Sequence, residues 1–471
     1  MTWTIHPDRA LPADSTLRPI AREIYAGVKD LPIVSMHGHV ESELLSRNEP
    51  FGDPAELLVR PDHYLVRMLV SAGVPHGALG VGPAGEVESD PRKIWRTFCE
   101  NWKLYRGTPT RYWMEDVLAN RFGVSVAPSA ETADTIYDEI SAALATDAFR
   151  PLALLDTFDI EAIATTDAAS STLSFHQDLA ARGYGQRVLP TFRPDALVHL
   201  DRADWRELLA ELSERSGITI GGYADYIAAL EQRRAYFKAN GARSSDHGHL
   251  TAASQPLTTA EASAIFDAAQ LGEITPAQAD AFSAHMLHEM ARMATEDGLT
   301  MQVHVGVLRN HNPETLALRG PDVGYDIPVA TEYTRSLRPI LNDFGHHPNL
   351  RLIVFTVDET TFSRELAPLA GVYPAMKLGA PWWFLDTPDV MRRFREAATD
   401  TAGFYNTTGF VDDTRAFFSI PARHDLARRV DAGHLARLVA EHRLDLSEAV
   451  ETAADLAYHL PKQAYPEVAG V

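Results

Sequence analysis

Eight short apolar or β-branched runs, separated by helical segments, constrain most strongly how this chain can fold. They begin near residues 32, 160, 187, 244, 301, 352, 373 and 407. Most are continuously apolar, which is typical of parallel strands covered on both faces. The run near residue 244, SSDHGHL, is polar and is the weakest of the eight. Strands that alternate with helices in this way predict an α/β fold of the (β/α)8 barrel type. An open doubly wound sheet is the alternative, but no G-x-G-x-x-G motif follows the first run.

A long stretch that reads as helical separates the first two runs. The loops after barrel strands form the functional face, so we expect this stretch to cover the barrel mouth. We therefore expect an N-terminal helix and first strand in residues 1–40, a large helical insertion in residues 41–155, and the remainder of the barrel in residues 156–471.

The charge and composition of the chain exclude several classes of partner. A formal net charge of −21 argues against nucleic acid or an anionic membrane, because both require a basic face. No apolar run reaches the roughly 18 residues of a membrane span, and the N-terminus has no signal-type apolar region. The lone Cys99 excludes an internal disulfide and fits a reducing compartment. We expect a cytoplasmic homo-oligomer with a small-molecule substrate.

The carboxyl ends of the predicted strands carry a set of potential metal ligands. His37 and His39 end the first strand and face the same way, since side chains alternate along a strand. His304 lies in the fifth strand and Asp413 ends the eighth. Such a set suits one divalent ion, and zinc is favoured because imidazole and carboxylate ligands suit it. The residues alone fit equally well with hydrogen-bonded core histidines and helix caps.

Other polar residues at the strand ends have less specific contexts. His247 and His249 lie in the weak polar run, so we expect a structural or substrate-contacting role for them rather than metal binding. Arg193 follows the third strand, Arg309 the fifth and Arg415 the eighth. If the substrate is an anion, such local arginines must oppose the negative field of the whole protein.

Several longer motifs, in this order along the chain, resemble those of the uronate isomerase family, which belongs to the amidohydrolase superfamily. They are HGH, PDHYLVRMLVSAGV, TPTRYWMEDVLANRFGV, IATTDA, VLPTFRPD, SDHG, MQVHVGVLRNHN, LGAPWWFLD and GFVDDTRAFFSIPARHDLARRV. The resemblance runs nearly from end to end. Gly38 departs from the cysteine that is frequent between the first two histidines of the family, but it lies outside the residues to which we assign chemistry.

The resemblance implies an isomerase that converts D-glucuronate to D-fructuronate, D-galacturonate to D-tagaturonate, or both, through a cis-enediol. It implies that Tyr64 transfers the C2 proton and that Arg415 stabilises the phenolate and the enediolate. Asp413 would bind the metal and assist ring opening, with His63 orienting nearby. The further implied site residues are Trp382 beside the sugar and Arg193 and Arg309 as candidates for the substrate carboxylate, which an arginine fork binds bidentately.

Two alternative functions remain open from the sequence. A metal-dependent hydrolase of the same superfamily would act on an ester, amide or lactone. Such an enzyme has no need of the Tyr64 and Arg415 pair, which favours the isomerase. The second alternative is a sugar-acid binding protein without activity, which turnover would exclude.

Overall fold

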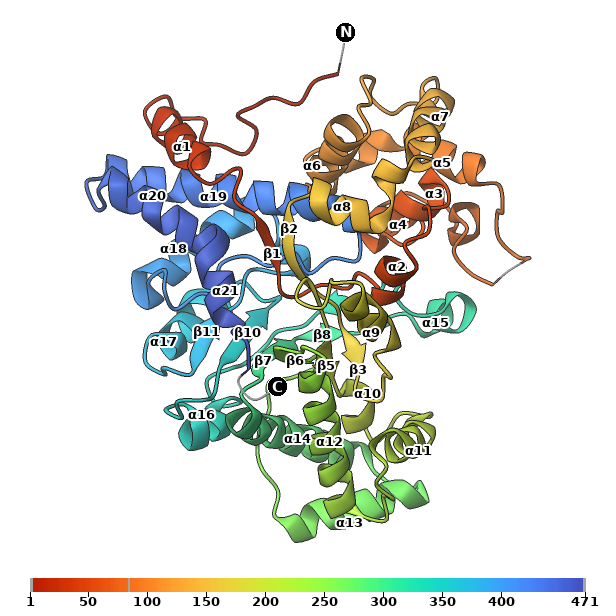
Figure 1. Cartoon of the computed structure of the whole chain (residues 1–471), viewed down its shortest axis with the longest axis vertical. Coiled ribbons are helices and arrows are strands. Elements are labelled where there is room, and N and C mark those ends of the chain that lie inside the picture. The colour runs from red at the N-terminus through yellow and green to blue at the C-terminus, as the bar shows by residue number, and fades with distance from the viewer. Residues whose placement is uncertain (1–2, 84, 469–471) are drawn as a thin grey trace.

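The computed structural model describes residues 3–83 and 85–468 and has the α/β architecture predicted from the sequence (Figure 1). Nine strands within the described part fall on or directly after seven of the eight predicted runs. They are β1 (Ile33–Ser35), β2 (Ile160–Ala164), β3 (Asp167–Ala168), β4 (Val188–Leu189), β5 (Thr191–Arg193), β6 (Ser244–His247), β7 (Thr300–Val305), β10 (Leu352–Thr356) and β11 (Met376–Leu378).

These strands are parallel and neighbour one another in chain order. β1 pairs with β2 and β2 with β4, while β3, which continues the run of β2, pairs with β5. β5 then pairs with β6, β6 with β7, β7 with β10 and β10 with β11. Pro190 separates β4 from β5, because proline has no N–H to donate to a neighbouring strand.

Backbone hydrogen bonds join the eighth run to the first and so bring the two ends of the series together. Thr407 forms an isolated parallel bridge with Leu378 of β11. The Asp413 amide donates to the His37 carbonyl at 3.2 Å, and the His39 amide donates to the Thr414 carbonyl at 3.0 Å. This arrangement is consistent with a closed (β/α)8 barrel, and it sets the end of the first run beside the end of the eighth.

Two details differ from the sequence prediction. The eighth run forms no strand beyond its single bridge, because Gly409 takes a φ of 75° and Asp413 a φ of 41°, and positive φ values interrupt a ladder. The weak polar run near residue 244, by contrast, is a fully buried strand, β6. A short antiparallel pair after β7, formed by β8 (Val307–Leu308) and β9 (Ile327–Pro328), has no counterpart in the prediction.

Helices fill the stretch between β1 and β2, as expected, and they occupy residues 42–157 where we predicted 41–155. They gather at the upper right of Figure 1, around an aromatic core that contains Trp95 and Phe98. The division into three segments stays a prediction. The helices are α2 (Ser42–Arg47), α3 (Pro54–Leu58), α4 (His63–Ser71), α5 (Pro91–Glu100), α6 (Pro109–Asp116), α7 (Ala133–Leu144) and α8 (Pro151–Thr157).

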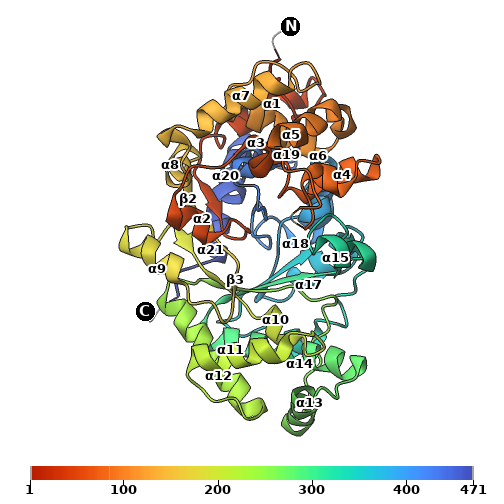
Figure 2. The ribbon, with the colours of Figure 1, turned by 90° about the vertical axis from the view of Figure 1, so that its right-hand side faces the viewer.

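Among the remaining helices, α11, α12 and α14 lie on the outer side of the strands (Figure 2), whereas α1 and α20 pack on α19. No helix of the described residues is both long enough and apolar enough to cross a membrane. These helices are α1 (Leu17–Ala26), α9 (Ser174–Ala181), α10 (Asp195–Val198), α11 (Trp205–Ser216), α12 (Tyr223–Ala239), α13 (Thr259–Leu271), α14 (Pro276–Asp297), α15 (Pro313–Arg319), α16 (Arg338–Phe344), α17 (Ala367–Ala370), α18 (Pro388–Ala402), α19 (Ile420–Ala440), α20 (Leu446–Ala454) and α21 (Leu460–Ala464).

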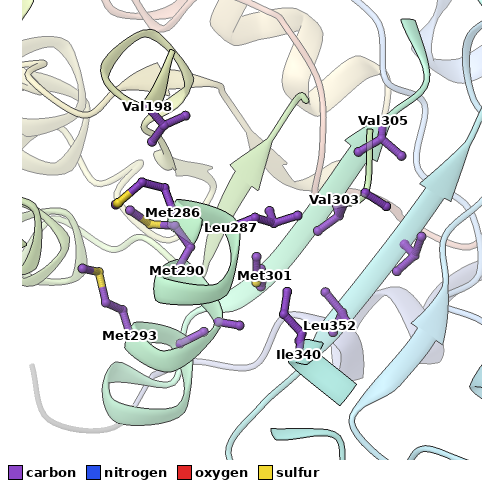
Figure 3. Packing of buried hydrophobic residues seen from close by; sticks show 14 of the residues in the cluster. Val198, Met286, Leu287, Met290, Met293, Met301, Val303, Val305, Ile340 and Leu352 are labelled. Atoms are coloured by element: carbon purple, nitrogen blue, oxygen red, sulfur yellow. The ribbon is translucent and has the colours of Figure 1, made fainter. Parts of the chain in front are cut away.

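The packing of α14 on β7 shows how the local sequence supports the sheet that carries the site. Thr275 begins α14 with a capping box: its hydroxyl accepts from the Gln278 amide, and the Gln278 side chain accepts from the Thr275 amide. Leu287 of this helix points toward Val303 of β7, while its methionines, including Met290, point away from the strand (Figure 3), and all belong to one buried hydrophobic cluster. Burial of each such side chain stabilises the fold by about 1.5–3 kcal/mol.

Candidate active site

Three of the four predicted metal ligands come together where the parallel strands end. His37, His304 and Asp413 each offer a ligand atom, and these atoms lie within 4.8 Å of one another. We call these three residues the metal group. His39 lies at its edge: its Nε2 is 3.1 Å from Asp413 Oδ1, but it does not belong to the tight group.

The metal group fits a cation better than it fits a hydrogen-bond network. Asp413 Oδ1 lies 3.1 Å from the Nε2 atoms of both His37 and His39, yet neither contact has hydrogen-bond geometry. His304 Nε2 is buried and has no hydrogen-bond partner among the described residues. Buried polar atoms are nearly always paired, so a set of converging unpaired ligand atoms is what a bound divalent ion would satisfy.

Burial and neighbouring charges act in opposite directions on the pKa values of the metal-group residues. Burial disfavours the protonated form of His37, but the carboxylates of Asp413 and Asp246 outweigh it and raise the pKa of His37. Burial also opposes ionisation of Asp413, yet the neighbouring histidines hold the pKa of Asp413 well below its usual range. Asp413 is therefore ionised near neutral pH.

Asp246 and Arg193 support the metal group through contacts behind His304. His304 Nδ1 lies 2.7 Å from Asp246 Oδ1, and the Arg193 guanidinium lies 3.3 Å from Asp246 Oδ2. Arg193 Nε also donates to Asp195 at 2.6 Å. A carboxylate on the outer nitrogen of a ligand histidine fixes its ring and its tautomer. Asp246 thus orients His304, and Arg193 balances the buried charge.

A pocket opens beside the metal group. α4 contributes to it from the insertion, α19 from the helical layer, and the loops after the first, fifth, seventh and eighth runs complete it. Its charged and aromatic lining residues are His39, Asp62, His63, Tyr64, Arg67, Arg309, Asp322, Asp326, Trp382, Trp383, Phe384, Asp413, Arg415 and Arg423.

His63 and Tyr64 enter this pocket together at the start of α4. The Asp62 carboxylate caps the helix by accepting from the amides of Tyr64 and Leu65. The His63 and Tyr64 rings stack with centroids 4.5 Å apart. Burial and the nearby Arg415 lower the pKa of His63 to about 3, so His63 is neutral. Burial and the charge of Asp386 raise the pKa of Tyr64 well above its usual value, so Tyr64 holds its proton.

Arg415 lines the same pocket as Tyr64, and its Nη2 lies 3.3 Å from Asp322 Oδ2. Its expected action on the Tyr64 phenolate stays a prediction. Arg423 lies over the face of the Tyr64 ring, with its Cζ 5.7 Å from the ring centroid. Arg423 itself is buried and donates to Asp386. Both partner carboxylates come from loops whose positions the sequence does not specify.

The two tryptophans of the WWF motif both line the pocket. Trp382 meets the His304 ring edge to face at 4.8 Å between centroids. Trp383 takes a φ of 53°, and Asp413 and Asp322 have φ values of 41° and 60°. Left-handed backbone at non-glycine residues costs about 1–3 kcal/mol each and is concentrated at functional sites. These three residues all line the pocket.

The two arginines predicted to bind the substrate carboxylate lie in different places. Arg309 lines the pocket, where it donates to Asp326 at 2.8 Å and lies near the Trp383 ring. Arg193 does not line the pocket, and Asp195 and Asp246 hold it on two sides. This position makes Arg193 a support for the buried carboxylates.

A second group of metal-type side chains consists of Asp195, His247 and His249, whose ligand atoms also lie within 4.8 Å of one another. Burial lowers the pKa of His247 to about 3 and that of His249 to about 4, so both are neutral. Neither histidine lines the pocket. The Arg193 guanidinium on Asp195 places a fixed positive charge there, which opposes a bound cation. The predicted structural or substrate-contacting role of the two histidines stays a prediction.

Sequence reasoning missed several residues of the site. Asp246 directly precedes His247 in β6, and the alternation of a strand sends these two side chains to opposite faces. Asp246 was missed because its run, SSDHGHL, is polar and is a weak predictor of a strand. Asp386 and Arg423 lie in motifs that we quoted, but only the fold shows that they pair beneath Tyr64. Arg67 follows Tyr64 by one helical turn, a spacing that could have indicated a shared face.

Fold and site together define an α/β enzyme with a histidine and aspartate cluster suited to a metal at the carboxyl ends of its parallel strands. The chain belongs to the glucuronate isomerase family, whose model matches residues 15–465. A uronate isomerase of Phenylobacterium zucineum is 51% identical over 462 residues, which cover 98% of this chain and 96% of the relative.

Two solved structures share the whole fold. That of glucuronate isomerase from Caulobacter crescentus has a TM-score of 0.97 at 50% identity and covers 99% of this chain and 97% of its own. That of uronate isomerase from Thermotoga maritima has a TM-score of 0.92 at 27% identity and covers 98% of this chain and 100% of its own. The family resemblance seen in the motifs is confirmed.

Proposed function

We propose that this protein interconverts an aldohexuronate and a ketohexuronate: D-glucuronate with D-fructuronate, D-galacturonate with D-tagaturonate, or both. The observation that carries the proposal is the composition of one pocket. Asp413 of the metal group, the proton-bearing Tyr64 and several arginines line the same cavity. A hydrolase has no need of a protonated, partly buried tyrosine in this pocket, so the isomerase is favoured.

The reaction sets demands that these side chains can meet. Moving the carbonyl from C1 to C2 requires ring opening, transfer of the C2 proton to C1, and stabilisation of charge on the enediolate oxygens. Tyr64 is our candidate for the proton carrier. Because Tyr64 holds its proton in the pocket, it gives this proton to the developing O1 oxyanion, and the resulting phenolate takes the proton that leaves C2. Tyr64 then delivers the carried proton to C1 while O2–H returns a proton to the phenolate, which leaves the 2-ketose and a neutral Tyr64. Neutral His63, stacked on Tyr64, orients the phenol, and Arg415 adds positive charge to the pocket.

We assign one divalent ion, Zn²⁺, to His37, His304 and Asp413, with His39 as a further ligand. When bound, such an ion supplies positive charge that polarises the sugar carbonyl and favours ionisation of nearby acids. The fit of the unpaired ligand atoms supports this assignment. Trp382, which contacts His304, provides an apolar wall for the sugar.

The expected cellular setting is also part of this proposal. The single, buried Cys99 supports a reducing compartment, which we take to be the cytoplasm. We further propose a homo-oligomer, which sedimentation equilibrium of the purified protein tests directly.

A coupled assay on D-glucuronate and D-galacturonate, read as formation of the 2-ketose, tests the function. We expect turnover of at least one of the two hexuronates. Hydrolysis of an ester, amide or lactone of similar size, without formation of a ketose from either hexuronate, would instead support the hydrolase.

A further inference from the structure

Four arginines line the pocket, and one of them differs from the rest in its surroundings. Within residues 3–83 and 85–468, no carboxylate oxygen lies within 4.0 Å of the Arg67 guanidinium. The other three each have an acidic partner. The pairs are Arg309 with Asp326 at 2.8 Å, Arg415 with Asp322 at 3.3 Å, and Arg423 with Asp386.

Arg67 packs against an aromatic ring and a loop, and not against an acidic side chain. Its Cζ lies 4.5 Å from the centroid of the Phe384 ring. A Cβ on Gly324, whose φ is +95°, would lie 2.8 Å from the Arg67 Cβ, so this loop packs directly on the arginine stem. Burial lowers the pKa of Arg67, which shows that its charge has lost water without gaining a carboxylate. A cation in this state attracts an anionic ligand.

The position of Arg67 on α4 relates it to the chemistry of the pocket. It follows His63 by four residues and Tyr64 by three, so all three side chains share one face of the helix. All three line the pocket. A hexuronate carries its carboxylate at C6, at the other end of the carbon chain from C1 and C2. A single helix can therefore present a proton carrier and an anchor for the distal carboxylate.

We propose that Arg67 binds the C6 carboxylate of the hexuronate. This inference rests on the proposed function and deepens it by naming the residue that recognises the anion. The planar guanidinium donates two parallel hydrogen bonds to the two carboxylate oxygens. The family resemblance implied Arg193 and Arg309 as candidates for this role. Arg193 lies outside the pocket between two acids of its own, and Arg309 lines the pocket but is already paired with Asp326.

The test compares Arg67→Met and Arg67→Lys with the wild type. Steady-state kinetics give kcat and KM for D-glucuronate. Isothermal titration calorimetry gives the Kd for D-glucarate, a dicarboxylate that has no aldehyde to isomerise. Arg335→Met is the matched control, because the Arg335 side chain is 87% exposed and does not line the pocket. Thermal melts verify that each variant is folded.

We expect Arg67→Met to raise both KM and the D-glucarate Kd roughly 10- to 100-fold, the cost of losing a hydrogen bond to a charged group. Its kcat should change far less. The KM and the D-glucarate Kd of Arg67→Lys should lie between those of the wild type and those of Arg67→Met. If Arg67→Met does not fold, Arg67→Lys is the decisive variant. Arg335→Met should match the wild type.

An unchanged Kd for D-glucarate in Arg67→Met would overturn the inference, and so would a loss of kcat with KM unaltered. These outcomes differ from failure of the proposed function. In that case the wild type itself forms no ketose from any hexuronate, and the assignment of Arg67 fails with it.

Discussion

His304 Nδ1 lies 2.7 Å from a carboxylate oxygen of Asp246, and both side chains are almost completely buried. This contact leaves His304 Nε2 free to face Asp413 and His37 across the metal group. The orientation of one ligand therefore depends on a residue that touches no substrate.

Replacement of Asp246 by asparagine should weaken metal binding without removing a ligand. We expect the Zn²⁺ Kd of Asp246→Asn to rise about 10- to 100-fold, as is typical when the partner of a ligand histidine is lost. Competition with a chelator of known affinity measures the change. Asp343→Asn is the control, since Asp343 of α16 contacts His288 of α14 and neither residue lines the pocket. Equal zinc affinities for Asp246→Asn and the wild type would refute the supporting role.

The metal content of the purified protein tests the ligand set. We expect about one Zn²⁺ per chain by elemental analysis, as a mononuclear site of nitrogen and oxygen ligands requires. His37→Asn should abolish it, whereas His249→Asn should retain it. Loss of zinc from His249→Asn with retention in His37→Asn would move the site to Asp195, His247 and His249.

The role of Tyr64 is tested by isotope and by substitution. Reaction in D₂O should place solvent deuterium at C1 of the ketose, because a proton carried by the protein exchanges with water. Tyr64→Phe should lose on the order of 10²–10⁴ in kcat. Tyr105→Phe is the control, since its hydroxyl donates to the Leu65 carbonyl in the core of the insertion. Complete retention of the C2 hydrogen, with Tyr64→Phe nearly unimpaired, contradicts the proton-transfer mechanism.

Arg193→Met should act on stability more than on substrate binding. The substitution leaves the carboxylates of Asp195 and Asp246 buried without their common cation. Breaking a buried ion pair on one side costs about 3–5 kcal/mol. We expect a lower melting temperature and a lower urea midpoint, with KM for D-glucuronate close to that of the wild type. A steep rise in KM at unchanged stability would restore Arg193 as the carboxylate-binding residue.

Acid should destabilise the protein through buried neutral histidines, of which His434 is the clearest. Burial lowers the pKa of His434 to about 3, and its Nε2 has no hydrogen-bond partner among the described residues. Its unfolded pKa is about 6.5, so its contribution is complete above that pH and is lost as the pH falls toward 3.

By this linkage, His434 costs about 2 kcal/mol of stability at pH 5 relative to pH 7. Urea denaturation of wild type and His434→Gln at both pH values measures the difference. The variant should lose less stability on acidification, and the exposed His346→Gln should behave as the wild type. Parallel losses in all three proteins would exclude this role of His434.

The sequence was sufficient for the α/β class and the order of the strands because continuous apolar runs and helix caps are local signals. It was insufficient for the eighth run, where positive φ values at Gly409 and Asp413 prevent a ladder. It also undervalued β6, whose serines and charged side chains are stabilised by contacts that form only in the folded state. An example is the Asp246 contact with His304.

The candidate site shows the same division between local and long-range information. The spacing of His37 and His39 indicated a metal site, and the positions of His304 and Asp413 in or at the ends of predicted strands added two further ligands. No local pattern distinguishes Arg67 from Arg415, since the difference lies in which acids the loops carry to each guanidinium. The pairing of Arg415 with Asp322 joins residues far apart in the chain. Such pairings are properties of the assembled pocket.

The backbone hydrogen bond from Asp413 to His37 joins the first and last runs of the sheet at the residues that would hold the metal. During synthesis the N-terminal part of a chain emerges and begins to fold first. A nascent chain that has released His37, the insertion and most of the strands still lacks Asp413, and with it both the closing hydrogen bond and the carboxylate. The contact closes the loop from residue 37 to residue 413, and the entropy of so long a loop opposes early closure. We therefore expect nascent chains that end before Asp413 to lack activity.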